Sequence, residues 1–399
     1  MEGCTRRSSF GSSALHAVHR SARRGVVVAV AVATLLGGGA GCSGGGGTTA
    51  PTTDRTATAR LHPDAPALIL GHRGAAGYRP EETLAADETG VRMGADLIEL
   101  DLVSTKDHVL VARHENEIGG TTDVADHPEF ASRRTTKRID GRTETGWFTE
   151  DFTLAELKTL RARERIPQVR PGNAQYDGRF PIATFDEVLA LRARLATELK
   201  RPVGVAPETK HPSYFASIGL PLEAPMLASL RRAGLGTGIE AAAPVIVQSF
   251  ELGNLLALKA GGAAVRTLFL VDAKGAPATH VAGAPDDYAG FVTPRGLAYL
   301  RGKVDIVGPE QSLVIPHTFT DALGGPTDLV ATAHAEGLEV IPWTFRAENQ
   351  FLPADYWVGT TLTSPGNAQQ LQQVFLEAGV DGLFTDQPDV TALARAAAG

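Results

Sequence analysis

Short apolar runs recur along the chain from residue 68 onward, and most of them end on a charged or polar residue. The runs lie at 68–71, 97–102, 203–206, 245–247, 267–270, 305–307, 340–344 and 382–385. Segments with helical spacing lie between them, at 81–93, 222–233, 251–260, 326–336 and 367–378. Strands joined by helical crossovers predict an α/β fold, a parallel (β/α)8 TIM barrel with its active site at the carboxyl ends of the strands. A doubly wound open sheet is the alternative, and no glycine-rich phosphate loop supports it.

The second apolar run is expected to continue into an antiparallel hairpin. Residues 106–108 separate two β-like segments, and so short a connection cannot join parallel strands. A turn near Asp107 brings His114 back roughly opposite Asp101. The charged stretch that follows, at about 115–180, predicts an insertion folded over the barrel rim.

Two capping boxes predict helices in and after this insertion. Thr153 is followed three residues later by Glu156, and Thr184 by Glu187. In such a box the two side chains bond to the first free backbone amides of a helix. We expect these helices to run to about residues 164 and 199.

The composition fits one large domain. The 399 residues are 43% hydrophobic and 21% charged, which is enough to bury the core of a single α/β barrel. The net charge is −7 and no basic tract stands out, so nucleic acid is not expected as a partner. The barrel domain is expected at 64–399, with the insertion inside it.

The first 42 residues have the pattern of an export signal. Five arginines and one acid precede an apolar segment at 25–36, and small residues then lead to Cys42. The apolar segment is too short for a comfortable membrane span. Cys42 follows Gly39-Ala40-Gly41, which resembles a bacterial lipoprotein processing site where the cysteine becomes the lipidated first residue. Gly39 departs from that pattern, which favours an aliphatic residue, so plain cleavage and an uncleaved anchor stay as alternatives.

A flexible linker is predicted after the leader. Residues 43–63 are rich in Gly and Thr and lack apolar periodicity. Cys4, the only other cysteine, lies in the leader, so the processed chain would have neither a disulfide nor a cysteine metal site. The expected location is the cell surface or periplasm, with a lipid anchor in the membrane, or otherwise secretion.

Acidic residues stand near the ends of the predicted strands. Glu99 and Asp101 are two residues apart in one strand, so their side chains share a face about 7 Å apart. Two acids on one face of an apolar strand are costly to bury, and a hard divalent cation is the usual compensation. Glu208 and Lys210 end the next barrel strand with the same spacing.

The motifs around these residues resemble the glycerophosphodiester phosphodiesterase family, and in particular its periplasmic or secreted bacterial branch. They are HRG at 72–74, PEET at 80–83, GADLIELDLVSTKD at 94–107 and the histidine at 114. The similarity continues through 121–126, 207–210 and 381–386, and so covers about 67–393. It implies metal-dependent hydrolysis of small-molecule glycerophosphodiesters to sn-glycerol 3-phosphate and an alcohol.

The resemblance also implies a cation site. In the family, acids that match Glu99, Asp101 and Glu208 ligate one divalent cation. Ligands that are all oxygen favour Ca²⁺ or Mg²⁺ over Zn²⁺. The secreted branch of the family points to Ca²⁺, with Mg²⁺ as the alternative.

The catalytic pair that the resemblance implies is His72 and His114. An imidazole titrates near neutral pH, so these side chains can serve as general acid and base. Arg73 and Lys210 can hold the phosphate, the arginine through a bidentate fork and the lysine as a point charge. Which histidine is the acid stays open, and so does the nucleophile, which is either water or the glycerol 2-hydroxyl.

Four further residues complete the predicted surroundings of the substrate. Glu81 either orients Arg73 or a cation-bound water, or is an acid favoured at a helix N-terminus. Phe250 and Trp343 end later strands and either pack on the glycerol carbons or close the top of the barrel. Asp386 is expected to be a structural brace.

Two other functions compete with the first. A phospholipase of C or D type would keep the fold and act on intact lipids, and an apolar patch on the barrel rim would favour it. A surface-displayed binding lipoprotein would keep the barrel without catalysis. The retention of two histidines beside three acids argues against the binding lipoprotein, because a protein that only binds has no need of them.

Overall fold

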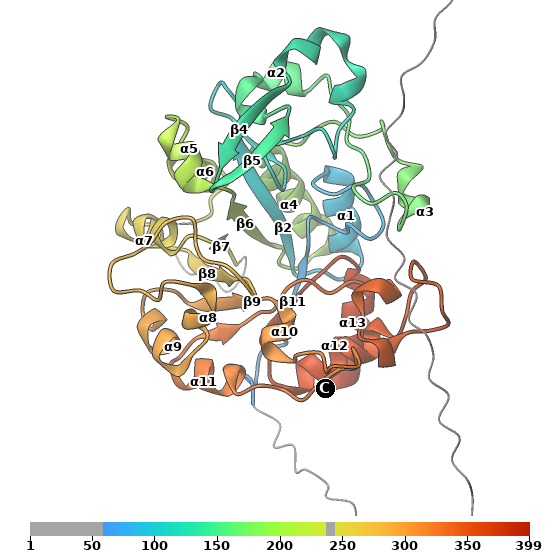
Figure 1. Cartoon of the computed structure of the whole chain (residues 1–399), viewed down its shortest axis with the longest axis vertical. Helices are drawn as coiled ribbons and strands as arrows, with labels where there is room; N and C mark the ends of the chain where they lie inside the picture. Colours follow the sequence, from blue (N-terminus) through green and yellow to red (C-terminus); the bar gives the residue numbers. More distant parts are fainter. Residues whose placement is uncertain (1–58, 237–243) are drawn as a thin grey trace, which may run out of the picture. The chain divides into compact units, whose positions relative to one another are not determined.

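The computed structural model describes residues 59–236 and 244–399. Eight parallel strands form a barrel (Figure 1). In hydrogen-bonded order they are β10 (Glu339–Val340), β9 (Ile306–Pro309), β8 (Arg266–Val271), β7 (Ile246–Ser249), β6 (Gly204–Thr209), β2 (Leu97–Ser104), β1 (Leu68–Gly71) and β11 (Gly382–Thr385). Each strand coincides with or overlaps a predicted apolar run, so the predicted barrel is confirmed.

The ring of strands closes between β10 and β11 through isolated backbone contacts. The amide of Asp381 donates to the carbonyl of Val340 at 2.8 Å, and that of Phe384 donates to Pro342 at 3.1 Å. Further along, the amide of Phe345 donates to the carbonyl of Phe384 at 2.8 Å. These contacts make the barrel nearly closed, although β10 itself has only two residues.

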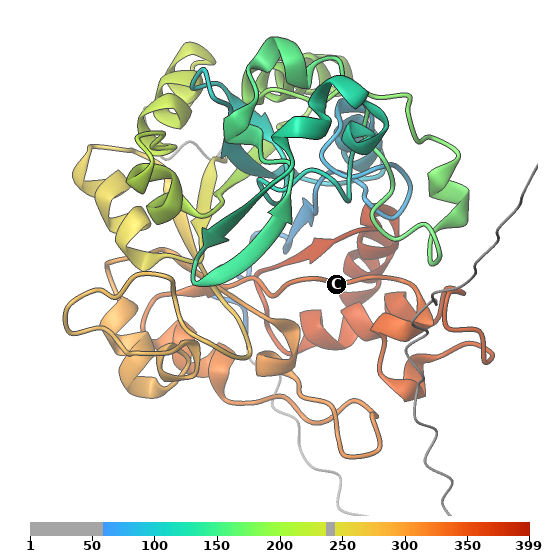
Figure 2. The same ribbon diagram turned by 45° about the horizontal axis from the view of Figure 1, so that its top comes forward.

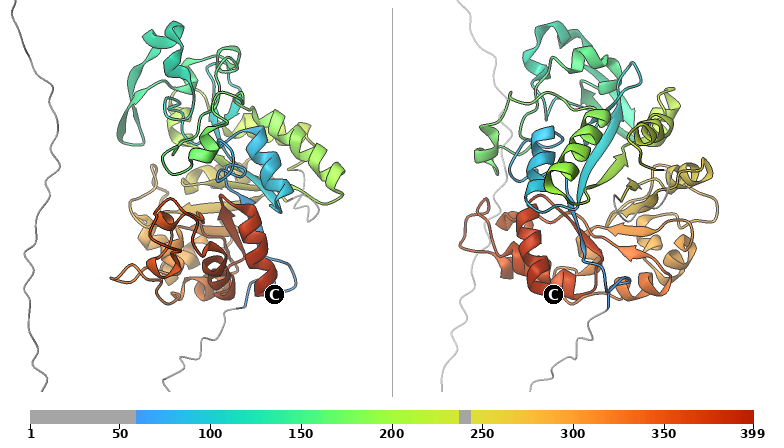
Figure 3. Two further views of the ribbon diagram at one scale, coloured as in Figure 1. Left: turned by 90° about the vertical axis from the view of Figure 1, so that its right-hand side faces the viewer. Right: turned by 180° about the vertical axis from the view of Figure 1, so that it is seen from behind.

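Helices cover the outside of the strands (Figure 3). The longer ones are α1 (Leu84–Arg92), α4 (Phe185–Leu199), α6 (Glu223–Arg232), α7 (Leu252–Ala260), α9 (Pro294–Leu300), α11 (Leu329–Ala335), α12 (Ala368–Glu377) and α13 (Pro388–Ala398). Short helices α5 (Pro212–Ser217), α8 (Tyr288–Phe291) and α10 (Gln311–Val314) follow β6, β8 and β9. The capping box predicted at Thr184 is formed, and α4 ends at Leu199 as expected.

Two apolar clusters explain why the strands read as continuous hydrophobic runs. One cluster fills the barrel, and the other lies between the strands and the helices. All eight residues of β2 are buried, because a strand in such a barrel is covered on both faces. The inner cluster consists of Leu70, Leu97, Ala206, Ile246, Leu268, Leu270, Ile306, Ile341 and Phe384. With the interior filled, charged side chains further along the strands lie at the carboxyl end.

The predicted hairpin is present. β2 pairs antiparallel with β3 (Leu110–Ala112), in the register Ser104↔Leu110. The turn includes Asp107, and His108 is exposed there with a φ of 62°, a left-handed conformation that favours glycine. The amide of Arg113 donates to the carbonyl of Asp101 at 2.9 Å, so the return strand brings residue 113 opposite Asp101, one residue short of the prediction.

The segment between β3 and α4 is mostly irregular. An antiparallel ribbon of β4 (Thr135–Ile139) and β5 (Arg142–Gly146) is its longest regular part, and Figure 2 shows it across the end of the barrel. The other elements there are η1 (Val124–Asp126), η2 (Pro128–Arg133), η3 (Thr149–Asp151), α2 (Leu154–Leu157) and α3 (Pro171–Ala174). Two further 3-10 turns, η4 (Asn349–Phe351) and η5 (Ala354–Tyr356), follow β10.

The helix predicted from Thr153 to residue 164 is wrong in its length. Its capping box is formed, but α2 ends at Leu157. Beyond it, the amide of Ala162 donates to the carbonyl of Phe180 at 2.8 Å, and Arg161 forms a bridge with Pro181. These extended pairings take the backbone groups that a longer helix would need.

Within residues 59–236 and 244–399, no helix has both the length and the hydrophobicity to cross a membrane. The predicted leader at 1–42, including Cys42, and most of the predicted linker lie outside the described residues.

Candidate active site

His72 stands directly after β1, and a carboxylate fixes its ring. Its Nδ1 lies 2.6 Å from Oδ1 of Asp386, which follows β11. The other oxygen of Asp386 accepts from Arg170 at 2.7 Å and from Arg346 at 3.1 Å. Burial, and then the charge of Arg73, lower the pKa of His72, so its ring is neutral near pH 7. Asp386 therefore braces the rim beside His72, as expected, and it also orients that predicted catalytic ring.

Arg73 lies at the centre of the site. Its φ of 53° is left-handed, and its backbone amide donates to Oε2 of Glu99 at 2.7 Å. Its side chain reaches Glu81 at 3.2 Å and Oδ2 of Asp101 at 3.2 Å. Glu81 therefore orients Arg73, which is one of the roles predicted for it.

The three predicted cation ligands come from two neighbouring strands. Asp101 of β2 is in register with Glu208 of β6, and Glu99 precedes Asp101 by two residues on the same strand. All three carboxylates are buried. Nζ of Lys210 lies 2.9 Å from Glu208 and 3.5 Å from Asp101. Gln248, at the end of β7, donates to Glu99 at 2.7 Å.

The negative charge of two of these three carboxylates is poorly balanced by nearby cations. Burial is the main cause that raises the pKa of Glu208 to about 8, and the charge of Asp101 adds to it. Burial and Asp101 also raise the pKa of Glu99 well above its usual range. Asp101 itself has a pKa below its usual range, because Lys210 and Arg73 outweigh the cost of its burial. The protein groups thus supply too little positive charge for three ionised carboxylates.

These side chains fit a hard divalent cation by their chemistry. Their donors are all oxygen, Oε1 of Gln248 is buried without a hydrogen-bond partner, and Oδ2 of Asp101 has an ion pair with Arg73 but no hydrogen bond. As the side chains stand, no three His, Cys, Asp or Glu residues in the described part of the chain converge closely enough to hold a metal. Lys210 and Arg73 instead contact the acids that such a cation would contact.

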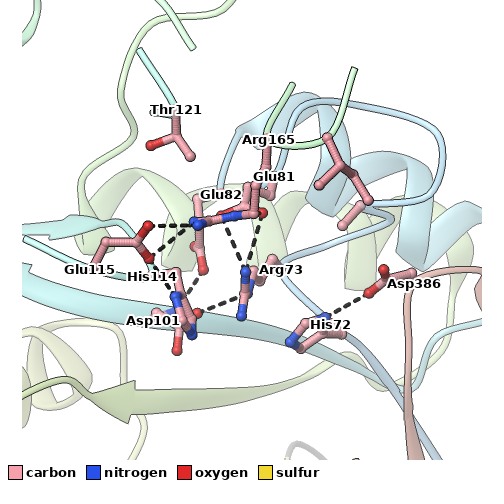
Figure 4. Close-up of polar contacts among 12 residues, drawn as sticks. His72, Arg73, Glu81, Glu82, Asp101, His114, Glu115, Thr121, Arg165 and Asp386 are labelled. Atoms are coloured by element: carbon pink, nitrogen blue, oxygen red, sulfur yellow. Dashed lines mark hydrogen bonds and ion pairs between the residues drawn. The ribbon is translucent and has the colours of Figure 1, made fainter. Parts of the chain in front are cut away.

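His114 lies on the other side of Arg73 from His72, next to Asp101 (Figure 4). Its Nδ1 contacts Oε2 of Glu115. Burial, and then Arg73 and Lys210, lower the pKa of His114 to about 3. Both predicted catalytic imidazoles are therefore neutral, and each has its Nδ1 held by a carboxylate, which leaves its Nε2 without that contact.

Arg165 joins the two halves of this arrangement. Its guanidinium lies 2.5 Å from Glu81 and 2.6 Å from Glu115, and so connects the partner of Arg73 to the partner of His114 (Figure 4). Sequence reasoning missed Arg165 because it stands in the irregular part of the insertion, where no periodicity marks which residues point toward the barrel.

Glu82 helps to fix the backbone of the site through its side chain and its carbonyl. Its Oε1 accepts from the amide of Asp101 at 3.0 Å. The carbonyls of Glu81 and Glu82 both accept from the buried guanidinium of Arg113, at 3.0 Å. Arg113 and Glu82 thereby tie the turn before α1 to β2 and the return strand.

Phe250 and Trp343 form an aromatic wall beside the acids. Their ring centroids are 5.6 Å apart in an edge-to-face arrangement. Nζ of Lys210 lies 5.6 Å from the Phe250 centroid, and Nε1 of Trp343 donates to the carbonyl of Gly308 at 2.8 Å. The two predicted aromatic residues are thus adjacent to each other and to Lys210.

Glu164, one residue before Arg165, yields a prediction on stability. It is 5% exposed, and burial raises its pKa from 4.5 to about 7. The folded state therefore holds this proton more tightly than the unfolded state, so stability falls as pH rises from about 4.5 to about 7. Glu164→Gln should stabilise the protein at pH 8 by about 1–3 kcal/mol and much less at pH 5.

Thermal unfolding of wild type and variant at the two pH values measures this difference. Glu377→Gln, an exposed change on α12, is the control and should shift neither curve. Equal stabilisation by Glu164→Gln at pH 5 and pH 8 would show that charge is not the cause.

The site lies at the carboxyl end of a (β/α)8 barrel, where barrel enzymes have their active sites. Its carboxylates, imidazoles and guanidinium groups place the protein in that class of enzymes. The family model described as the glycerophosphoryl diester phosphodiesterase family matches residues 72–390. The chain belongs to this family. Its members are phosphoric diester hydrolases, so this chain is an enzyme and not a binding lipoprotein that has kept only the barrel.

Relatives named glycerophosphodiester phosphodiesterase match most of the chain. One from Arabidopsis thaliana is 36% identical over 340 residues, which are 79% of this chain and 82% of that protein. One from Haemophilus influenzae is 27% identical over 352 residues, 81% of this chain and 88% of its own.

Solved structures share the fold at lower identity. A phosphodiesterase of Oleispira antarctica, solved in complex with the product sn-glycerol-3-phosphate, has a TM-score of 0.53 and 17% identity, over 82% of this chain and 96% of that one. A glycerophosphodiester phosphodiesterase of Agrobacterium tumefaciens has a TM-score of 0.50 and 17% identity, over 82% and 99%.

Proposed function

We propose that this chain hydrolyses glycerophosphodiesters to sn-glycerol 3-phosphate and an alcohol, with a divalent cation and two histidines. The observation that carries the proposal is the contact of Arg73 and Lys210 with Asp101 and Glu208, beside Glu99 and between two neutral imidazoles. The Oleispira phosphodiesterase with sn-glycerol-3-phosphate supports the choice of product.

The chain's own residues would divide the work as follows. Arg73 and Lys210 would neutralise the phosphate, since each already faces anionic oxygens in the site. His72 and His114 would move the protons of the attacking and leaving oxygens through Nε2, because Asp386 and Glu115 hold their Nδ1 atoms. Arg165 would hold Glu81 and Glu115 in place.

The three acids would hold the cation. A cation bound there would supply Lewis acidity toward the phosphoryl oxygens. Ca²⁺ is the proposed ion and Mg²⁺ the alternative, because both prefer oxygen donors. Phe250 and Trp343 would pack against the carbons of the glycerol moiety, since they stand beside Lys210.

Hydrolysis of glycerophosphocholine with and without a chelator tests this function. The enzyme should release glycerol 3-phosphate, lose activity with EDTA and regain it when Ca²⁺ is restored. Activity that survives exhaustive chelation would rule out the cation, and the absence of turnover with Ca²⁺ or Mg²⁺ would rule out the reaction.

A phospholipase acting on intact lipids is the second candidate, because apolar side chains are exposed on loops that follow β9 and β10. Phe319 is fully exposed, and Val358 and Leu362 are about half exposed. The two loops are joined by a hydrogen bond from the amide of Leu323 to Asp355 at 3.0 Å. Release of diacylglycerol or phosphatidic acid from phosphatidylcholine vesicles, at rates above those with glycerophosphocholine, would favour this candidate.

Export and lipid anchoring are proposed from the leader. Its basic segment, its short apolar segment and Cys42 support processing as a lipoprotein of the cell surface or periplasm. Wild type expressed with labelled palmitate should incorporate label and fractionate with membranes, whereas Cys42→Ala should do neither. Label retained in Cys42→Ala would place the lipid elsewhere.

A further inference from the structure

The β4–β5 ribbon is strongly basic in a chain whose net charge is −7. Residues 133–142 read RRTTKRIDGR, with five cations and one acid. The expectation that no basic tract stands out is therefore wrong for this segment. Pairing of β4 with β5 places Lys137, Arg138 and Arg142 on one short hairpin, whose turn is Asp140-Gly141, and Arg134 directly precedes it.

Three of the arginines have no acidic partner. Arg134, Arg138 and Arg142 are exposed, and within the part of the chain that the structure describes no carboxylate lies within ion-pair distance of them. Lys106, exposed in the β2–β3 turn, has no acidic partner there either. Glu144 is the one exposed acid on the paired strands, so the surface of the ribbon carries a net positive charge.

The ribbon is fixed beside both sides of the active site. At its turn, Asp140 lies 2.5 Å from Nδ1 of His211, which directly follows Lys210. Near its base, Nζ of Lys137 lies 2.8 Å from Glu150. Glu150 accepts at 3.1 Å from Asn116, two residues after His114. The ribbon thus runs between the segments that carry Lys210 and His114, across the barrel end (Figure 2).

A concavity lies against the ribbon. Its volume is about 650 Å³, and Lys106, His108, Lys137, Arg138, Tyr214 and Leu220 are among the residues that line it. Glu150 and Asp151 also line the concavity, and the hydroxyl of Tyr214 donates to Glu150. The cations stand beside apolar side chains, which suits an organic anion better than a bare inorganic one. Lys137 is neutralised by Glu150 and Asp151, so Lys106 and Arg138 are the free cations of this wall.

We propose that the basic ribbon recognises a second anionic group, such as a further phosphate, in the alcohol moiety of the substrate. The inference rests on the proposed function, because the alcohol is the part of the substrate that extends beyond the scissile phosphate. Arg138 and Arg142 flank the turn that contacts His211, with their side chains on opposite faces of the ribbon, and either would make charge-assisted hydrogen bonds to that group from its own side. A lipid surface is less favoured as the target, because Ile218 is the one exposed large hydrophobic side chain among the described residues that lines the concavity, and none lies on the ribbon.

Two substrates that differ by one glycerol phosphate unit test this specificity. Glycerophosphoglycerol carries one phosphodiester, and bis(glycerophospho)glycerol carries two. Wild type should have the higher kcat/KM for the second compound. Arg138→Gln with Arg142→Gln should lower that preference roughly tenfold, while kcat/KM for glycerophosphoglycerol stays unchanged. Rising NaCl should erode the wild-type preference, because exposed charges are screened.

A matched variant controls for net charge. Arg231→Gln with Arg295→Gln removes two exposed guanidinium groups from α6 and α9, outside the site and the ribbon, and should leave the preference intact. An equal effect of both double variants would overturn the inference, and so would an equal loss for both substrates in the ribbon variant. Loss of binding to phosphatidylglycerol vesicles with unchanged kinetics would assign the ribbon to membranes instead.

Calorimetry separates this inference from the proposed function. Bis(glycerophospho)glycerol is titrated into full-length His72→Ala protein with and without the two ribbon substitutions, so that binding is read without turnover. Weaker binding in the ribbon variant supports the inference even if wild type hydrolyses neither compound. Equal affinity in the two proteins would reject it even if hydrolysis is confirmed.

Discussion

Alanine in place of His72 or His114 should lower kcat for glycerophosphocholine by about 10²- to 10⁴-fold, the usual contribution of a general acid or base. Each imidazole is neutral near pH 7 because burial and nearby cations lower its pKa. Each is also held at Nδ1 by a carboxylate, which fixes the tautomer and the direction of Nε2. Under the proposed mechanism, loss of either ring would remove one of the two proton-transfer steps.

The measurement is steady-state release of glycerol 3-phosphate, together with thermal unfolding to show that the variants are folded. His317→Ala is the control: this exposed histidine lies on a loop, its ring contacts Asp321, and the variant should retain wild-type kcat. Wild-type turnover in either active-site variant would remove that residue from the mechanism.

Asp386→Asn should reveal a positioning role rather than a catalytic one. The amide keeps the shape of the side chain but removes the charge that orients His72 and pairs with Arg170. We expect a smaller loss of kcat than in His72→Ala and a shift of the pH–rate profile. A lower kcat with an unchanged profile would mean that Asp386 acts only through the packing of the rim.

The barrel strands could be predicted from the sequence because they are buried on both faces. Every residue of β2 and of β6 is buried, so each appears as an almost uninterrupted apolar run whose few charged residues stand out. Those exceptions, Glu99, Asp101 and Glu208, are the predicted cation ligands. The same burial that produces the hydrophobic pattern therefore also marked the site.

The insertion could not be predicted in the same way. Its helix at Thr153 begins with a correct capping box but ends after one turn, because pairings with residues far along the chain replace the helical bonds. Arg165 and Arg170 come from this irregular stretch, and their partners Glu81 and Asp386 are 84 and 216 residues away. Contacts at such separations depend on the fold, and no local pattern in one sequence indicates them.

Glu99→Gln should weaken Ca²⁺ binding by about tenfold to a hundredfold, because affinity at such sites follows the number of charged ligands. Glutamine has nearly the same size, and its amide oxygen can still accept from Gln248 or from the backbone amide of Arg73. The substitution therefore removes charge with little change in packing. Titration calorimetry on chelator-treated, full-length protein measures the affinity, with Glu377→Gln as the charge-matched control on α12.

The same substitution should have opposite effects on stability without and with the cation. Without Ca²⁺, Glu99→Gln relieves the repulsion between Glu99 and Asp101, two buried acids on one strand face, so the variant should melt at a higher temperature than wild type. With Ca²⁺ at a hundred times its Kd, wild type gains about 2.7 kcal/mol by mass action, and the variant gains less because its Kd is higher. The variant should therefore melt above wild type without Ca²⁺ and below wild type at saturating Ca²⁺. Unchanged Ca²⁺ affinity together with a uniform shift of both curves would show that Glu99 is not a ligand.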